Sequence, residues 1–149
     1  MSGWDGDISK MGRLAENIGK LARISSQIST VVSYKIRQLI DDEFIAQCDP
    51  YGGAWEPLAQ STIEREGPHP ILELSGSMHR SLEVLPMGGA GVSVYISHPG
   101  EDHQTGWSGT QGEGPARPVL PSGPLPPLWK EAIDDAVSER IISTMSGDK

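Results

Sequence analysis

The sequence predicts an α+β fold: a small antiparallel β-sheet packed by helices, with a helical N-terminal region and a C-terminal helix. Two observations support this prediction. Only four of the 30 glycine and proline residues precede Cys48, so turns are concentrated in the rest of the chain. Apolar residues recur every three or four positions near both ends, and they alternate with polar residues in the middle. The 149 residues fit one domain, with residues 1–48 as the helical region and residues 49–149 as the α+β core.

The N-terminal region carries two apolar stripes at helical spacing. The first consists of Ile8, Met11, Leu14, Ile18 and Leu21. The second consists of Ile28, Val32, Ile36, Leu39 and Ile40. Between them, the segment RISSQIS is poor in helix-forming residues, so we expect either two helices or one long helix broken near Ser25 and Ser26. The proline and glycines of CDPYGG end the helical region.

Short elements follow. The segment WEPLAQSTIERE predicts a short helix entered through Pro57. In ILELSGSMHRSL, a turn at Ser75 and Gly76 is expected to open another short helix, with a serine available as its cap. SLEVLP and GVSVYIS are predicted strands, and the glycines between them make a hairpin. The second strand should turn Val92, Val94 and Ile96 toward one face.

The last third of the chain is expected to begin with a loop. GTQGEGPARPVLP predicts this loop and a short strand from Arg117 to Leu120. The final helix should have Pro126 or Pro127 in its first turn. One face of this helix is lined at a spacing of four by Trp129, Ile133, Val137 and Ile141.

Composition argues against several classes of function. The net charge is −8, and residues 1–48 carry six basic and six acidic side chains, so the acidic surplus lies in residues 49–149. This balance is unfavourable for a protein whose main task is gripping a phosphate backbone. The single cysteine, Cys48, leaves no intramolecular disulfide and no cysteine-rich zinc cluster. We expect a protein of the reducing cytoplasm, without a signal peptide or a membrane span.

The stretch HPGEDHQTGW concentrates possible metal ligands. They are His98, Glu101, Asp102 and His103. A small metal-dependent hydrolase could use them, but Pro99 and Gly100 predict an irregular segment, whereas paired metal histidines usually extend from a regular helix. The chain has no G-x-S-x-G elbow of a serine hydrolase, and GTQGEGP lacks the lysine and the Ser or Thr of a phosphate loop. No catalytic residue, metal or cofactor is therefore predicted.

Four tryptophans are many for a chain with one phenylalanine. They are Trp4, Trp55, Trp107 and Trp129. Two are expected in the core, and the loop tryptophans are candidates for contacts with another subunit. The glycine-rich segments 88–91 and 106–114 have too little apolar content to fold alone. We expect them to become ordered against a neighbouring subunit, with Trp107 as the anchor.

The order of several motifs resembles that of a known family. The elements are W-x-P-L…T in WEPLAQSTIE, I-L-x-x-[ST]-G-x-[LM]-x-x-S-[LIV] in PILELSGSMHRSL, H-Q-x-G in HQTG and A-R-P-x-L in PARPVL. Together they resemble the phage virion-morphogenesis or tail-completion proteins of the head–tail neck. The resemblance spans about residues 44–120 and falls on Trp55, Pro57, Leu58, Thr62, Ile71, Leu72, Ser75, Gly76, Met78, Ser81, Leu82, His103, Gln104, Gly106, Ala116, Arg117, Pro118 and Leu120. In one departure, GED stands where the family usually has a tyrosine and an alanine ahead of the histidine–glutamine pair.

The resemblance implies a non-enzymatic assembly protein of a tailed phage or prophage, located in the virion neck and, before assembly, in the host cytoplasm. Such a tail-completion, terminator or connector subunit would form a ring with its own copies, six-fold as first choice and twelve-fold as second. Other neck, tail-tube or connector proteins would be its partners. DNA would pass through the channel without specific binding.

Roles for individual residues follow. His103 and Gln104 would belong to a structural turn after a strand and would fix the chain path by hydrogen bonds to the backbone. Arg117, held between two prolines, would offer its donors to carboxylates or carbonyls of another element or subunit. The candidates for the channel surface are Glu101, Asp102 and Glu113.

Two other classes of function remain open. One is the metal-dependent hydrolase built on the histidine-containing stretch. The other is a toxin-neutralising or regulatory binding protein, which would form a stable complex with one partner and no ring.

Overall fold

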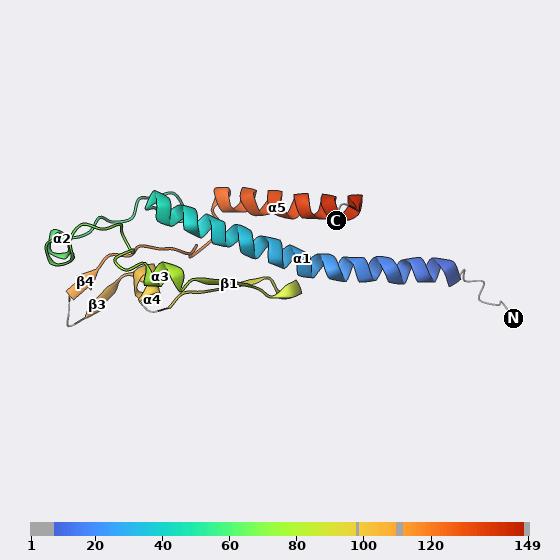
Figure 1. Ribbon diagram of the computed structural model, residues 1–149, viewed down its shortest axis with the longest axis horizontal. Helices are drawn as coiled ribbons and strands as arrows, with labels where there is room; N and C mark the ends of the chain where they lie inside the picture. Colours follow the sequence, from blue (N-terminus) through green and yellow to red (C-terminus); the bar gives the residue numbers. More distant parts are fainter. Residues whose placement is uncertain (1–7, 98, 110–111, 148–149) are drawn as a thin grey trace.

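The computed structural model describes residues 8–97, 99–109 and 112–147, and it confirms the predicted α+β class. In chain order its elements are α1 (Ile8–Ala46), α2 (Gln60–Glu66), α3 (Ser77–Arg80), β1 (Glu83–Pro86), the 3-10 turn η1 (Gly88–Ala90), β2 (Val92–Tyr95), α4 (Gly100–Thr105), β3 (Trp107–Gly109), β4 (Gly112–Gly114) and α5 (Pro127–Ser146). The strands form two separate antiparallel hairpins, β1–β2 and β3–β4. Helix α1 forms the long axis, with α5 along one side and hairpin β1–β2 along another (Figure 1). Trp4 lies outside the described residues.

Helix α1 runs unbroken for 39 residues, so the expected break near Ser25 and Ser26 is wrong. The hydroxyl-bearing residues of this region bond to the preceding helical turn instead of competing with it. Ser29 Oγ donates to the Ser26 carbonyl at 2.9 Å, and Ser33 Oγ donates to the Thr30 carbonyl at 2.7 Å. Packing of the apolar face then outweighs weak propensity. Despite its length, α1 is not apolar enough to cross a membrane, and the same holds for the other helices of the described chain.

The predicted stop after α1 is confirmed. Gln47 adopts a left-handed conformation with φ of 56° directly after the helix. Asp49 then closes the turn, because its Oδ1 accepts the backbone N–H groups of Tyr51 at 2.8 Å and Gly53 at 3.0 Å. The chain reverses here and brings Trp55 back onto the end of α1.

The C-terminal helix α5 is also confirmed, and it lies antiparallel to α1 (Figure 1). Pro127 occupies the first turn, where its missing N–H costs nothing. Trp129 and Ala136 are buried, and the other predicted positions of this face are half-buried: Ile133, Val137 and Ile141.

The predicted hairpin β1–β2 forms with Glu83 opposite Tyr95 and Pro86 opposite Val92. Val92 and Val94 are half-buried, whereas Ser93 and Tyr95 are exposed, as the alternation predicts. The tip of the hairpin reaches α1 near Ser25. This hairpin therefore covers the middle of α1 with a small, one-sided sheet.

Helix α3 follows the turn at Ser75 and Gly76 as predicted, whereas α2 begins later than the sequence suggests and α4 lies where no helix was expected. Helix α2 begins at Gln60 instead of at Pro57, and the carbonyls of Glu56 and Pro57 accept hydrogen bonds from Arg117. Helix α3 has Gly76 at its N-cap position, and the Ser75 hydroxyl accepts the N–H of Ser77 at 3.3 Å. The segment expected to be an irregular turn after Pro99 is helix α4.

The predicted strand from Arg117 to Leu120 is absent, and hairpin β3–β4 precedes this segment instead. We call residues 115–121 the proline strap. Pro115, Pro118 and Pro121 have no backbone N–H, so the strap cannot maintain a strand ladder, and the chain bends at residues 119 and 120. Most of its backbone hydrogen bonds are to side chains, and the Arg117 N–H bonds to the backbone of α4.

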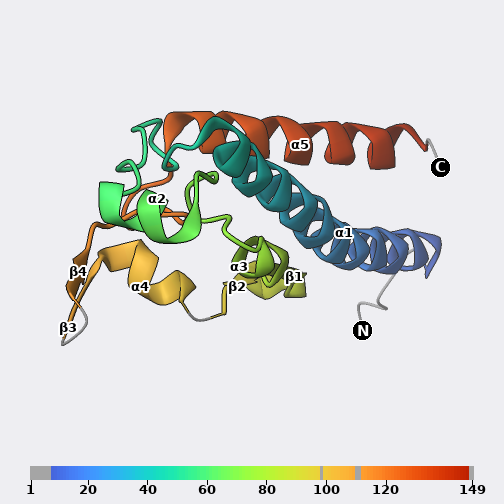
Figure 2. The same cartoon turned by 60° about the vertical axis from the view of Figure 1, so that its left-hand side comes forward.

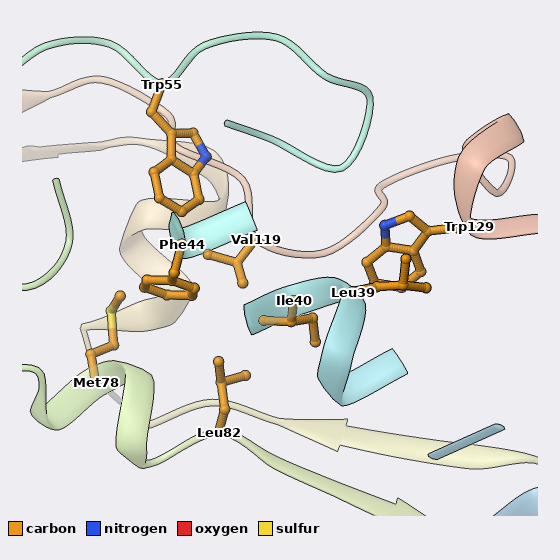
Figure 3. Close-up of a cluster of buried hydrophobic side chains, with 8 residues drawn as sticks. All are labelled: Leu39, Ile40, Phe44, Trp55, Met78, Leu82, Val119 and Trp129. Carbon is orange, nitrogen blue, oxygen red and sulfur yellow. The ribbon is translucent and has the colours of Figure 1, made fainter. Parts of the chain in front are cut away.

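The core lies where the C-terminal half of α1 meets the strap, α3 and α5 (Figure 3). Its buried side chains are Leu39, Ile40, Phe44, Trp55, Met78, Leu82, Val119 and Trp129. Phe44 and Trp55 pack edge to face, with ring centroids 5.3 Å apart. Trp55 and Trp129 are thus core tryptophans.

A buried carboxyl group interrupts this apolar core. Glu43 is only 5% exposed, and Trp129 donates its indole N–H to Glu43 Oε1 at 3.0 Å. Glu43 Oε2 has no hydrogen-bond partner within the described part of the structure. Burial raises the pKa of Glu43 from 4.5 to about 8, while the indole N–H opposes this increase and the nearby Asp49 charge adds to it.

This pKa predicts an unusual dependence of stability on pH. A carboxyl whose pKa is raised in the folded state stabilises the fold fully below pH 4.5, and this contribution is lost as the pH rises to about 8. Glu43→Gln keeps an acceptor for the Trp129 indole but cannot ionise. We therefore expect the free energy of unfolding of the wild type to fall relative to this variant between pH 5 and 8 in urea titrations. Parallel curves for the two proteins would show that Glu43 is not titrating in this range.

Candidate functional site

The candidate site is built around the proline strap, which exchanges side-chain hydrogen bonds with residues 55–57. Trp55 donates its indole N–H to the Pro118 carbonyl at 2.9 Å. In return, Arg117 donates from Nε to the Glu56 carbonyl at 2.7 Å and from Nη2 to the Pro57 carbonyl at 2.9 Å. Two segments about 60 residues apart in the sequence are thereby joined without a β-ladder.

Helix α4 binds the same strap from the other side, through hydrogen bonds of Gln104. Gln104 Oε1 accepts the N–H groups of Val119 and Leu120, both at 3.0 Å, and Gln104 Nε2 donates to the Leu120 carbonyl at 2.6 Å. The Arg117 N–H donates to the His103 carbonyl at 2.6 Å. Gln104 therefore fixes the chain path through backbone hydrogen bonds, as the resemblance to neck proteins implies, but from a helix and not from a turn.

Arg117 is a buried cation held by neutral acceptors. It is 8% exposed, and desolvation lowers the pKa of its guanidinium, whereas the Glu56 charge opposes the decrease. A guanidinium remains charged even when its pKa is lowered, so carbonyl dipoles must replace its water. The predicted bridge to carbonyls is confirmed, and it joins elements of one chain.

A cleft of about 290 Å³ opens beside this network. It lies between α2, α4 and hairpin β3–β4, which gather at the end of the molecule opposite the N-terminal end of α1 (Figures 1 and 2). Among its lining residues are Leu58, Arg65, His69, His103, Trp107 and Glu113. The Arg65 hydrogen bond, followed by that from His69, lowers the pKa of Glu66 in the same wall. The cleft is thus walled by an aromatic ring and groups of both charges.

Hairpin β3–β4 forms one wall of the cleft and depends on glycine. Gly106 has φ of 78°, and a Cβ there would lie 3.0 Å from the Gly114 carbonyl oxygen and 3.1 Å from the Ala116 nitrogen. The Trp107 indole lies over Gly114, where a side chain would overlap it. Trp107 is nevertheless 39% exposed, as the expected anchor for a neighbour should be.

The GED segment is compatible with this site although it departs from the family pattern. Gly100 is buried, and a Cβ there would overlap the side chain of Ile96. Glu101 and Asp102 follow in the first turn of α4, where negative charge favours a helix. The glycine lets α4 approach the end of β2, so the path into the histidine–glutamine pair is maintained.

The three acidic candidates do not form one cluster of defined chemistry. Glu101 on α4 and Glu113 on β4 are exposed, and Asp102 is half-buried. No group of three His, Cys, Asp or Glu side chains that could hold a metal occurs in residues 8–97, 99–109 and 112–147. His98, the fourth predicted ligand, lies outside these ranges.

The predicted site residues separate into two places in the fold. Those from residues 55–58 and 103–120 meet at the strap and the cleft: Trp55, Pro57, Leu58, His103, Gln104, Gly106, Trp107, Ala116, Arg117, Pro118 and Leu120. Ser75 and Gly76 lie apart, at the start of α3. Glycine is favoured at Gly76 because its φ of 68° is in the left-handed region.

Three polar residues that the sequence did not single out also shape this end of the fold. Gln47 holds Ile71, since its Oε1 accepts the Ile71 N–H at 2.5 Å. His79 stacks on Phe44 and contacts Asp41 at 2.8 Å and Glu73 at 3.0 Å. The third is the buried Glu43, three residues after Ile40 of the second stripe, a spacing that by itself also fits a solvated carboxyl. The other two partnerships join distant segments, so no local pattern indicates them.

Comparison of the chain with models of protein families, with curated proteins and with solved structures gives no match.

We call the three hydrogen bonds of Gln104 to Val119 and Leu120 the Gln104 clamp. Removing this clamp should lower the stability of the fold. Gln104→Met retains the length of the side chain but leaves two N–H groups and one carbonyl of the strap without partners. We expect the free energy of unfolding to fall by roughly 2–4 kcal/mol, because buried backbone groups would be unsatisfied. The matched control Gln60→Met, at an exposed position of α2, should change it by less than about 0.5 kcal/mol. Equal effects of the two substitutions in urea unfolding would contradict the clamp.

Arg117 allows a second test of the strap. Arg117→Lys retains the charge but cannot donate in two fixed directions, so we expect a loss of about 1.5–3 kcal/mol in unfolding free energy. Arg65→Lys is the control, because the side chain of Arg65 is 69% exposed and its ion pair with Glu66 contributes little. If Arg117→Lys is as stable as the wild type, the guanidinium geometry is not what holds the strap.

Proposed function

We propose that this chain is a non-enzymatic assembly protein of a tailed phage or prophage, acting at the head–tail neck as a tail-completion, terminator or connector subunit. The observation that carries the proposal is the strap network. The resemblance to neck proteins at positions 55–57 and 103–120 rests in part on Trp55, Gln104 and Arg117. The side chain of each binds backbone groups of the same two segments. Motifs separated in the sequence thus belong to one piece of the fold.

The chemistry of this network supports a structural role over a catalytic one. The polar groups of Trp55 and Gln104, and the Arg117 Nε and Nη2, are engaged with backbone groups of the same chain. An acid, base or nucleophile must instead present its reactive atom to a substrate. The network rigidifies a surface, which is what repeated contact with identical neighbours requires.

Electrostatics supports a position beside passing DNA. Glu101 and Glu113 are exposed at the end of the molecule that carries the cleft, and the chain as a whole is strongly acidic. In a ring, six-fold by preference and twelve-fold as second choice, an acidic wall would avoid the phosphate contacts that slow ejection. DNA would then pass without specific binding, and the partners would be further copies and other neck, tail-tube or connector proteins.

The oligomeric state of the purified protein tests this proposal. Native mass spectrometry and negative-stain images should reveal a closed ring with a central channel. Metal analysis of the same sample discriminates against the hydrolase alternative. A stoichiometric metal that is lost in His103→Ala would contradict the proposal, and so would a protein that stays monomeric at high concentration and binds a single partner without a ring.

A further inference from the structure

Helix α1 continues beyond the body of the subunit as an arm. The hairpin tip meets α1 at Ser25, because a Cβ on Gly89 would lie 3.4 Å from Ser25 Oγ. In Figure 1 the part of α1 before this point runs past both the hairpin tip and the C-terminal end of α5. Figure 2 shows that α1 also diverges from α5 in this direction. We call residues 8–23 the arm.

An apolar groove of about 560 Å³ begins where the arm ends. Its floor is α1 from Ile24 to Ile36, and its sides are the tip of hairpin β1–β2 and the region around α5. The apolar lining consists of Ile24, Ile28, Val32, Ile36, Val92, Leu125 and Ile133. Leu125 is 51% exposed, and the other six are only half-buried, so the groove remains open to solvent. Covering these side chains with a further apolar surface would lower the free energy, because their apolar area would leave water.

The arm matches the groove in length and in pattern. Sixteen residues from 8 to 23 make a helix roughly 24 Å long, and the thirteen residues of the groove floor make one of roughly 20 Å. Leu14 and Val32 are eighteen positions apart, which is five turns at about 3.6 residues per turn. At this helical spacing, the apolar positions of the arm continue the stripe of positions that forms the groove floor.

The charges of the arm and the body are complementary. Residues 8–23 contain four basic side chains and one acidic side chain, whereas the remainder of the chain has eight basic and nineteen acidic ones. Helix α5, which contributes Ile133 to the groove, has four acidic side chains against two basic ones. All four of these carboxylates are on exposed residues: Glu131, Asp134, Asp135 and Glu139. A basic helix with an apolar stripe therefore fits an apolar groove on an acidic body.

We propose that the groove of each subunit is filled by the arm of a second copy of this chain. The arm extends away from its own body, so it covers a groove by crossing to a neighbour. This contact requires only a second copy, so it goes beyond the neck role and does not depend on it.

Photo-crosslinking tests which chain supplies the arm. A benzophenone amino acid at position 18, in a mixture of ¹⁴N-labelled and ¹⁵N-labelled protein, should join the arm of one chain to groove peptides 24–36 or 88–92 of another. Light–heavy pairs should therefore appear in these peptides. Crosslinks confined to one chain, or crosslinks that avoid the groove, would overturn the proposal. If a ring forms without arm-to-groove crosslinks, only the arm exchange fails, and the neck role is unaffected.

A substitution in the arm tests the energetics. Leu14→Gln together with Ile18→Gln should weaken self-association roughly tenfold or more in sedimentation velocity, because two apolar side chains leave the contact. The control Glu16→Gln introduces the same residue about half a helical turn from Leu14 and Ile18 in the 3.6-residue repeat, and it should leave association within about twofold. The urea unfolding of the double variant as a monomer should match that of the control variant at the same dilution. Unchanged association of the double variant, or a wild-type protein that remains monomeric, would overturn the proposal.

Discussion

The three prolines of the strap impose the constraint on which the rest of this fold depends. They remove N–H donors from a segment that passes through the core, where Val119 is only 1% exposed. Three of the remaining donors are satisfied individually: the Arg117 N–H by the His103 carbonyl, and those of Val119 and Leu120 by Gln104. Because these partners stand on α4, the strap fixes the position of α4 relative to the core. The exchange between Trp55 and Arg117 fixes residues 55–57 in the same way, so one segment determines the geometry of the whole cleft end.

Sequence periodicity predicts the large elements of this fold but not all of the small ones. Helices α1 and α5 and hairpin β1–β2 repeat their pattern over enough residues to be predicted, whereas α4 has only six residues and begins after a proline and a glycine. The strand expected from Arg117 to Leu120 fails because Pro118 has no N–H and the N–H groups of Val119 and Leu120 bond to the Gln104 side chain instead of to a neighbouring strand. The break expected at Ser25 and Ser26 fails because serine hydroxyls can bond within the helix.

Only those features of the candidate site that depend on neighbouring residues in the sequence could be predicted. The prolines beside Arg117 indicated a fixed exit for its side chain, and the backbone-binding role of Gln104 followed from the resemblance to neck proteins. Neither feature indicates which carbonyls accept the Arg117 hydrogen bonds, because Glu56 and Pro57 are distant from Arg117 in the sequence. Glu43 was missed because a single carboxyl within a helical stripe resembles a solvated position until the partner helix α5 covers it. Partnerships between distant segments are tertiary information, and no local pattern contains them.

The two ends of α1 have different roles in the function that we propose. Its C-terminal half carries residues of the core, whereas its N-terminal arm contacts the next subunit. The most direct test of the neck role is a cryo-electron microscopy reconstruction of the neck of particles produced by a phage or prophage that encodes this chain. We expect density for a ring of this protein between head and tail, with the end that carries Glu101 and Glu113 facing the DNA channel or its rim. A neck in which the protein is absent, or in which it turns a lysine- and arginine-rich surface to the channel, would contradict the account.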